Sequence, residues 1–417
     1  METVFEEWDA YAQKKSLQMR DFPFRQLLSN VRLKIIAITG MRRSGKTSIL
    51  LLLHQKLSQQ QEKSSYINLE DSRIKNDPQV LDTLLKWFGE QGYLLLDEIT
   101  SVKDWEGWIA RNHEMLKGRL KLILSSSRRG LAIPHKPLRG RILTYEVYPL
   151  SFREFLQFRK ISWEKTTVGL GKIEKALEEY LVYGGFPEVV LMSEKTEKIN
   201  LLNSYFKDIL GLDVAEIAKE KVSTVDLFGR YLAESSYFSA SKCLNFFKSQ
   251  GYKIAKQSLL ELEKYSQESY LFFFVPFFSY TMKSRSQYPR KSYCGDSGFL
   301  YAITGRKDWG RLYENAVFLE LRRRNGPAVE INYWKNNAGQ ETDFVLREGL
   351  KTKEIIQVAY DLHEGNTKRE IFSLVECARA LKAKKSSVIT KNIEKKEIEG
   401  GIHIEFIPLW KWLLTLE

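Results

Sequence analysis

Apolar and polar positions in the first 160 residues alternate in a pattern that predicts strands and helices in turn. One helix is predicted to begin near residue 48, after the first strand, and another is predicted over about 78–90, after the second strand. Alternating strands and helices are typical of an α/β fold. Short apolar runs predict the strands at 34–39, 65–70, 93–98, 120–124 and 142–148.

The pattern becomes helical after residue 160. Apolar residues such as Ile173, Leu177 and Leu181 recur at three- and four-residue steps, which predicts helices over about 163–212.

A different order follows from about residue 219. Helices near 239–242 and over 254–265, separated by Gly251, precede an apolar, hairpin-like run at 270–280. Helix, turn, helix and ribbon is compatible with a winged helix. The second helix carries basic and polar residues that suit phosphate contacts, namely Lys253, Lys256, Gln257 and Lys264. A winged helix that docks a protein or acts as a spacer is the alternative.

The last third of the chain predicts a further α/β unit. Its order is helix, three strands, helix, strand and strand. The predicted elements are 312–321, 330–334, 341–347, 354–359, 367–381, 387–390 and 403–408.

Composition indicates a folded protein of several domains. The 417 residues are 43% hydrophobic and 28% charged, which excludes disorder as the overall state. The longest apolar run, 270–278, is about half as long as a bilayer-spanning helix. Cys243, Cys294 and Cys377 are too scattered for a disulfide framework or a thiolate metal site. We expect a reduced, cytoplasmic protein with no membrane partner.

The net charge of the chain indicates which partners it favours. Lys and Arg number 65 against 52 acidic residues, a net charge of +13. Such an excess favours polyanions such as nucleic acid. The alternative is a Lys-rich surface that only keeps the chain soluble.

The strongest chemical signal follows the first predicted strand. Residues 40–47 read GMRRSGKT, which is the G-x-x-x-x-G-K-T pattern of a P-loop, and a helix follows. The glycines let backbone amides surround a phosphate, Lys46 reaches the β- and γ-phosphates, and the Thr47 hydroxyl binds Mg²⁺. ATP and Mg²⁺ are therefore the expected cofactors. The residues expected at the nucleotide are Gly40, Arg42, Arg43, Ser44, Gly45, Lys46, Thr47 and Ser48.

A pair of carboxylates ends the strand at 93–98. Asp97 is placed to hold Mg²⁺ together with Thr47, and Glu98 can act as general base on the attacking water. The extra strand at 65–70 and the adjacent Glu98 match the additional-strand ATPases that include the AAA+ group.

Two further catalytic contributions are predicted. A polar residue after the strand at 120–124, Ser127 or Ser125, is expected to contact the γ-phosphate or the attacking water, unless it only caps a turn. Arg139 or Arg141 is a candidate arginine finger, in cis or from a neighbouring subunit, with a surface position as the alternative.

Several motifs resemble an archaeal and bacterial AAA+-like ATPase family over essentially the whole chain. They are residues 40–47, LDEI at 96–99, LRGR at 138–141, YPLSFREF at 148–155, YGGFPE at 183–188, ENAVFLEL at 314–321 and ETDF at 341–344. Members of this family usually carry a C-terminal domain of unknown function with a nuclease-like fold. YGGFPE resembles the family's signature in a small helical lid.

Together these features predict a fold of class α/β. The resemblance implies an AAA+-like P-loop NTPase with a helical lid, a winged-helix domain and a C-terminal PD-(D/E)xK nuclease-like domain. The expected parts are a P-loop ATPase core at 1–160, the lid at 161–218, the winged helix at 219–285 and the nuclease-like domain at 286–417.

Chemistry argues against nuclease activity. Asp343 fits the first carboxylate of a two-metal site, and Glu314 or Glu320 could join it from the preceding helix. The next strand has Gln357 and Ala359 where that fold needs an acid and a lysine. We therefore expect a domain that grips DNA or docks a protein without cutting. The Lys-rich stretch at 382–396 either helps in this or is a solvated face.

The sequence thus predicts a Mg²⁺-dependent ATPase that acts on nucleic acid, most simply DNA. The alternative is a nucleotide-gated DNA- or protein-binding switch with little turnover. An intact Asp97–Glu98 pair favours the ATPase, because a pure binder needs no general base. The sequence leaves the oligomeric state open.

Overall fold

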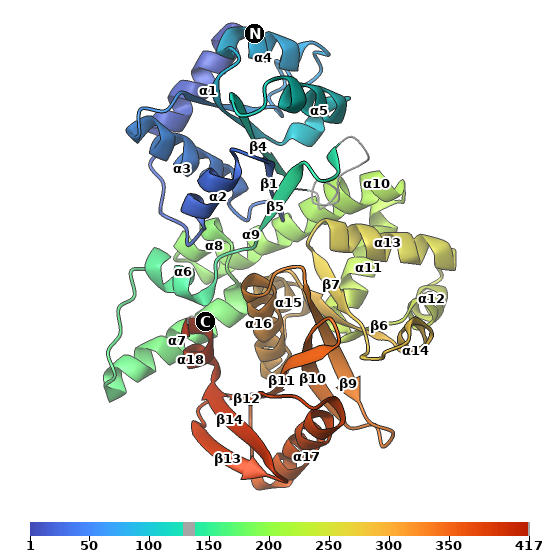
Figure 1. The fold of residues 1–417 in the computed structure, drawn as a ribbon. Coiled ribbons are helices and arrows are strands. Elements are labelled where there is room, and N and C mark those ends of the chain that lie inside the picture. Colours follow the sequence, from blue (N-terminus) through green and yellow to red (C-terminus); the bar gives the residue numbers. More distant parts are fainter. Residues whose placement is uncertain (128–137, 416–417) are drawn as a thin grey trace. The chain divides into compact units, whose positions relative to one another are not determined.

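The five strands predicted in the first 160 residues form one parallel sheet in the computed structural model, which describes residues 1–127 and 138–415 (Figure 1). Their order is β2-β3-β4-β1-β5, so β4 lies between the strand before the P-loop and the strand that ends in Asp97. This is the strand order of P-loop AAA+ ATPases. The strands are β1 (Ile35–Gly40), β2 (Ser64–Asn68), β3 (Gly92–Asp97), β4 (Leu120–Ser126) and β5 (Ile142–Val147).

Helices cover both faces of this sheet, as the buried central strands β1, β3 and β4 require. Ile35 and Ala37 of β1 belong to the apolar cluster that includes residues of α4 and α5. Ile36 and Ile38 belong to the opposite cluster, which includes residues of α2 and α3. The helices are α1 (Glu2–Lys14), α2 (Phe24–Asn30), α3 (Lys46–Gln59), α4 (Val80–Phe88) and α5 (Trp105–Met115), with a 3-10 turn η1 (Ile99–Ser101).

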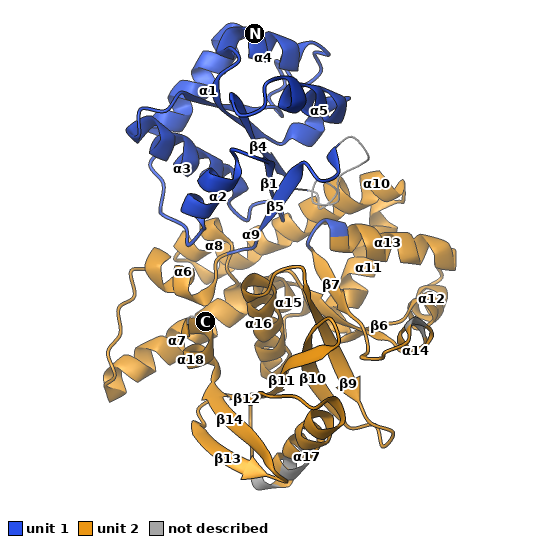
Figure 2. Ribbon diagram, in the orientation of Figure 1, with its two compact units in different colours: residues 1–149, 268–270 blue, residues 150–267, 271–417 orange. Residues whose placement is uncertain are grey.

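Contacts group the chain into two units (Figure 2). Unit 1 holds residues 1–149 with 268–270, and unit 2 holds 150–267 with 271–417.

Unit 2 begins with α6, which lies before the helices predicted over 163–212 and within the range 1–160 expected for the ATPase core. The first of its helices, α6, starts with a capping box in which Ser151 and Glu154 satisfy each other's backbone amides. Its helices are α6 (Phe152–Phe158), α7 (Thr167–Tyr183), α8 (Pro187–Leu191), α9 (Lys195–Asp208), the π-helical turn η4 (Ile209–Ala215) and α10 (Glu216–Ala218).

A three-stranded sheet with its own helices follows. Both predicted helices are present, as α12 and α13, and the antiparallel sheet has the order β6-β8-β7. Strand β8 starts after residue 285, so this sheet extends past the boundary expected there. The elements are α11 (Val222–Glu234), β6 (Tyr237–Phe238), α12 (Ala240–Ser249), α13 (Lys256–Glu268), β7 (Phe272–Val275), α14 (Met282–Gln287) and β8 (Arg290–Cys294).

The last third forms a six-stranded sheet of order β13-β14-β12-β11-β10-β9. The predicted order of helix, three strands, helix and strands is present, and β13 is an added edge strand that starts at the end of the Lys-rich stretch. The elements are α15 (Ser297–Thr304), α16 (Trp309–Arg324), β9 (Val329–Lys335), β10 (Glu341–Glu348), β11 (Lys351–Ala359), α17 (Glu364–Leu381), β12 (Ser386–Thr390), β13 (Lys395–Glu399), β14 (Ile402–Pro408) and α18 (Leu409–Leu414).

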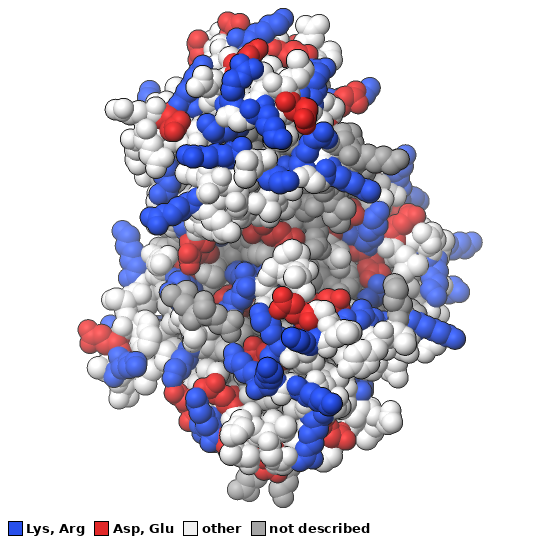
Figure 3. Space-filling model, in the orientation of Figure 1, with Lys and Arg blue, Asp and Glu red and all other residues white. Residues whose placement is uncertain are grey.

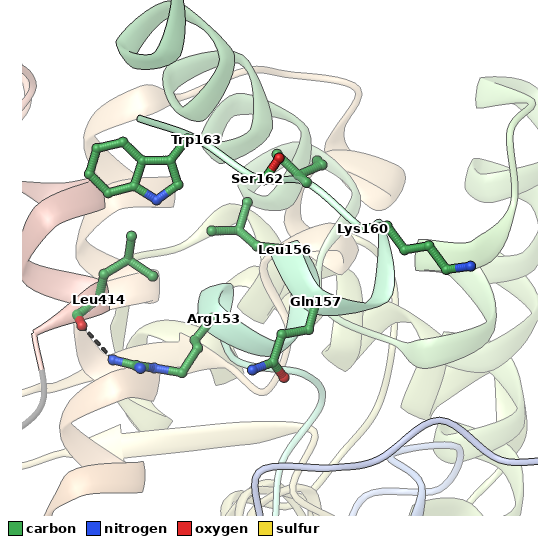
Figure 4. A pocket seen from close by; sticks show the side chains of 8 residues that line it. Arg153, Leu156, Gln157, Lys160, Ser162, Trp163 and Leu414 are labelled. Carbon is green, nitrogen blue, oxygen red and sulfur yellow. Dashed lines mark hydrogen bonds between the residues drawn. The ribbon is translucent and has the colours of Figure 1, made fainter. Parts of the chain in front are cut away.

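A hollow of about 570 Å³ lies in unit 2 beside α6 and α18 (Figure 4). Leu156, Trp163 and Leu414 line it, and the guanidinium of Arg153 donates a hydrogen bond to the backbone carbonyl of Leu414. Among the described residues, no helix combines the length and the hydropathy of a membrane-spanning segment.

Candidate nucleotide-binding site

The loop between β1 and α3 has a backbone that only certain residues adopt easily. Gly45, directly before α3, has φ 101°, and this left-handed conformation favours glycine. A Cβ on Gly40 would lie 2.1 Å from the carbonyl oxygen of Val147 on β5, so only glycine fits there. The loop leads into the N-terminus of the 14-residue helix α3, where free backbone amides and the helix dipole attract an anion.

Lys46 lies across this loop. Its buried Nζ donates hydrogen bonds to the carbonyls of Gly40 at 3.0 Å and Met41 at 3.1 Å. The same Nζ is 3.7 Å from Oε1 of Glu98. The ammonium group is therefore held between the loop and the acidic end of β3, where it can neutralise phosphate charge.

Asp97 is buried at the centre of a hydroxyl cluster. Thr47 donates to its Oδ2 at 2.7 Å, Tyr66 donates to the same oxygen at 2.8 Å, and Ser125 donates to Oδ1. Burial raises the pKa of Asp97, the negative charge of Glu98 raises it further, and the three hydrogen bonds oppose the change. A cation would offset this cost of burying the carboxylate. Carboxylate and hydroxyl oxygens are the ligands that Mg²⁺ prefers, so Asp97 and Thr47 fit this ion.

Glu98 is held in place by the tip of β4. Its backbone is left-handed, with φ 51°, and its amide donates to the Ser125 hydroxyl at 3.0 Å. Its carboxylate accepts a hydrogen bond from the Ser127 amide at 3.1 Å. The Ser125 hydroxyl therefore contacts both Asp97 and Glu98, whereas Ser127 contacts Glu98 through its backbone amide.

Three family models match consecutive parts of the chain. An AAA domain matches residues 32–156, and domains of unknown function, DUF8612 and DUF4143, match 174–309 and 309–412. An uncharacterized protein of Methanocaldococcus jannaschii is 33% identical over 97% of this chain and 92% of its own length. The chain belongs to the AAA+ P-loop ATPase family with a C-terminal DUF4143 domain.

More distant similarities are also found. An uncharacterized protein of Haemophilus influenzae is 28% identical over 91% of the AAA+ chain and 94% of its own length. AMPPCP-bound DnaA from Aquifex aeolicus covers 59% of the chain and 86% of its own length, with 15% identity and a TM-score of 0.29.

The remaining residues expected at the nucleotide in this AAA+ protein differ in burial and in their contacts. The guanidinium of Arg42 is 3.8 Å from the Glu70 carboxylate, and Arg43 is exposed with φ 66°. Ser48 is half-buried in the first turn of α3. The Ser44 hydroxyl is buried and has no hydrogen-bond partner among the described residues.

The two arginines predicted as a finger lie away from this loop within unit 1. Arg139 and Arg141 precede β5, and Ile142 pairs with Ile35 at the start of β1, whereas Gly40 pairs with Val147 at its end. A strand of this length separates the arginines from the loop by roughly 20 Å. Arg141 instead approaches Glu114 at 3.3 Å. The finger role of Arg139 or Arg141, in cis or from a neighbouring subunit, therefore stays a prediction, and the register of β1 and β5 places both arginines toward the end of the sheet away from the loop.

Sequence reasoning missed two residues at the AAA+ site. Tyr66 on β2 reaches Asp97, and burial raises the pKa of its hydroxyl well above the ordinary value, so Tyr66 stays a neutral donor. Arg20 is buried and donates to the backbone carbonyls of Ser44 at 2.7 Å and Tyr148 at 3.1 Å. No motif surrounds Arg20, and the strand pairing that brings Tyr66 to Asp97 has no sequence signature.

The residues considered for a nuclease site come together only in part. Asp343 and Glu314 both bind the ammonium group of Lys291 at 2.8 Å. Burial acts to lower the pKa of Lys291, but the carboxylates outweigh it and the pKa lies well above its ordinary value. Glu320 is not part of this group, because it pairs with Arg323 and Arg324 on its own helix.

Gln357 is engaged with its neighbours. Its side-chain amide donates to the Glu370 carboxylate at 2.7 Å, and its carbonyl accepts from the Asp343 amide at 3.3 Å.

Proposed function

We propose that this AAA+ protein binds ATP with Mg²⁺ and hydrolyses it, and that the nucleotide state governs its grip on nucleic acid. The observation that carries the proposal is the position of Glu98, 3.7 Å from the Lys46 ammonium and next to the Asp97–Thr47 pair. A protein that only binds nucleotide has no use for a carboxylate there.

Each group has a role in this proposal. The amides of the loop and Lys46 bind the phosphates, and Thr47 and Asp97 would hold the ion. Mg²⁺ would supply charge neutralisation at the β- and γ-phosphates. Glu98 accepts the proton of the attacking water, and the Ser127 amide orients its carboxylate.

Turnover should depend on Mg²⁺. We expect phosphate release from ATP with Mg²⁺ and its loss in excess EDTA, because the ion that Asp97 and Thr47 would hold would supply charge neutralisation at the phosphates. Phosphate release and ATP affinity are measured in parallel on the full chain. Tight ATP binding without phosphate release would instead favour the nucleotide-gated switch.

The partner is proposed from charge and from the helices of the middle segment. Strand order β6-β8-β7 with α11, α12 and α13 is compatible with the proposed winged helix. Lys256, Gln257 and Lys264 are exposed on α13, and Lys253 is exposed in the loop before it rather than on the helix. Figure 3 shows basic side chains over much of the visible face, interspersed with acidic ones, and some project where α12 and α13 lie. Lysines on such a helix suit contacts to DNA phosphates.

DNA affinity should therefore depend on salt and on these lysines. The double substitution of Lys253 and Lys256 by Glu should weaken binding to duplex DNA. It should also reduce the dependence of the binding constant on salt concentration, because each neutralised phosphate contributes about −0.9 to the slope of log K against log[salt]. Fluorescence anisotropy over a salt series measures both.

The matched control changes Lys172 and Lys175, which are exposed on α7, to Glu. This control changes the net charge by the same amount as the Lys253/Lys256 double variant, and it should leave DNA affinity nearly unchanged. If the two double variants behave alike, or if the wild type binds little DNA near 0.15 M salt, the partner is a protein.

The DUF4143 part is proposed to be a nuclease-like domain without nuclease activity. Its order of elements supports the interpretation, and neutral Gln357 with Ala359 replaces the acid and lysine that cleavage needs.

A further inference from the structure

Residues 268–270 belong to unit 1, although the chain on both sides of them belongs to unit 2 (Figure 2). They are the last residue of α13, the helix with exposed Lys256 and Lys264, and the two residues that follow it. Tyr270 is the last of the three, and its side chain is only 1% exposed. A buried tyrosine directly after this helix is therefore part of the unit that holds the nucleotide site.

The Tyr270 hydroxyl contacts two neighbouring strands of the parallel sheet. It lies 2.8 Å from the Thr39 hydroxyl on β1, and it donates a hydrogen bond to Oε1 of Glu146 on β5 at 3.3 Å. Thr39 and Glu146 are opposite each other in the register of these strands. Since the single hydrogen of the tyrosine hydroxyl is directed to Glu146, Thr39 is the donor to Tyr270.

This contact lies one residue before the P-loop. Thr39 is followed by Gly40, whose carbonyl accepts a hydrogen bond from Nζ of Lys46 at 3.0 Å. The phosphates of a bound nucleotide compete with this carbonyl for the ammonium group. Nucleotide binding therefore changes the hydrogen bonding of Gly40, and Thr39 is the neighbour through which this change reaches Tyr270.

A second connection joins the P-loop to the same tyrosine. Arg20 donates to the backbone carbonyls of Ser44 and Tyr148. The Tyr148 hydroxyl donates to Oε2 of Glu146 at 2.6 Å, and its ring lies edge-on to the Tyr270 ring with centroids 6.3 Å apart. Glu146 thus accepts hydrogen bonds from both tyrosines, and the loop is linked to Tyr270 through Ser44 as well as through Gly40.

The backbone of Tyr270 has a conformation that is uncommon for a bulky residue. Its φ of 63° lies in the left-handed region. Such a conformation persists only where the surroundings fix it, and it is frequent at switch regions. The next amide, that of Leu271, donates to the carbonyl of Ser266 in the last turn of α13 at 3.1 Å. A change at the Tyr270 hydroxyl therefore acts on a strained backbone that is tied to the end of α13.

We propose that Tyr270 is a positioning residue that couples the nucleotide state of the P-loop to the last turn of α13. The inference rests on the proposed nucleotide binding and deepens it, because it names the residue through which nucleotide regulates the lysine-bearing helix. Coupling of this kind is reciprocal, so loss of the Tyr270 hydroxyl also changes nucleotide affinity, by a factor that is typically about 5 to 150. The effect needs neither DNA nor a protein partner.

The test compares wild type and Tyr270→Phe, which keeps the ring and removes the hydroxyl. Hydrogen–deuterium exchange of the full chain is measured with and without a saturating, non-hydrolysable ATP analogue. In the wild type the analogue should slow exchange at 41–50 and change it at 266–272 by about 5-fold or more. In Tyr270→Phe the slowing at 41–50 should remain, whereas the change at 266–272 should be lost. Calorimetry with the same analogue measures the reciprocal change in affinity.

Tyr333→Phe is the matched control. Tyr333 is equally buried, with 1% exposed, and its hydroxyl donates to the backbone carbonyl of Pro289 at 2.6 Å. Its loss should lower Tm as Tyr270→Phe does, because each variant loses a buried hydrogen bond. It should leave the nucleotide-dependent exchange at 266–272 unchanged, which separates coupling from stability.

Two results would overturn the proposal. One is the same analogue-dependent change at 266–272 in wild type and Tyr270→Phe, and the other is a wild type in which the analogue affects 41–50 alone. Absence of any slowing at 41–50 in the wild type would refute nucleotide binding at this loop, and the coupling with it. If Tyr270→Phe does not fold, Thr39→Val decides in its place, because it removes the same hydrogen bond from the other side.

Discussion

Replacing Glu98 with Gln should lower ATP turnover by about 10²- to 10⁴-fold while ATP still binds, because the amide keeps the shape but cannot accept a proton. The Lys46 ammonium 3.7 Å away and the Ser127 amide both contact the Glu98 carboxylate, so the substitution also removes a negative charge beside the phosphate site. Phosphate release under saturating ATP measures turnover, and calorimetry measures binding.

Glu90→Gln serves as the control for this experiment. Glu90 is an exposed carboxylate paired with Arg119 at 3.0 Å, so its loss changes the charge equally without touching the site. It should leave turnover unchanged. Wild-type turnover in Glu98→Gln would mean that another group activates the water.

Replacing Lys46 with Ala should abolish tight ATP binding. Removing a buried, hydrogen-bonded charge at a binding site costs about 2 to 5 kcal/mol, which weakens affinity by roughly 30- to 4,000-fold. In the described structure Lys46 already donates to the Gly40 and Met41 carbonyls, so its ammonium is in place before the phosphates arrive. Calorimetric titration with ATP measures the loss.

Lys56→Ala is the matched control for Lys46→Ala. Lys56 lies at the other end of α3 and packs over the Phe24 ring, 5.3 Å from its centroid. ATP affinity should survive this change. If both variants bind ATP as the wild type does, the nucleotide site is elsewhere.

The parallel sheet could be predicted because its central strands β1, β3 and β4 are short and almost continuously apolar. Ile35 to Ile38 are all buried, so the run stands out without any knowledge of its neighbours. Strand β13 carries four charged residues and an exposed Ile398, and nothing in its composition predicts a strand. It forms because β14 offers it a partner, and pairing of this kind is invisible in a single segment.

The candidate site also contains residues that a local sequence pattern predicts and residues that only the fold brings together. Lys46, Thr47, Asp97 and Glu98 could be predicted because each adjoins a strand end with a recognisable local pattern. Tyr66 reaches Asp97 only because β2 and β3 are neighbours, with Asn68 opposite Asp97.

Other residues depend on long-range contacts as well. Arg139 and Arg141 precede β5, which starts beside the beginning of β1 and so at the end of the sheet away from the P-loop, and the motif alone does not show this. Lys291 lies in no motif, and its partners follow it by 23 to 52 residues.

Strand β13 also affects how separate copies of the chain meet. The edge of a sheet has unpaired backbone groups that can recruit a strand from another molecule, and aggregation starts in this way. At this edge Lys395, Lys396, Glu397 and Glu399 leave one apolar residue among five. An incoming strand would have to bring its side chains against this row of charges, so β13 disfavours self-association at this edge of the six-stranded sheet.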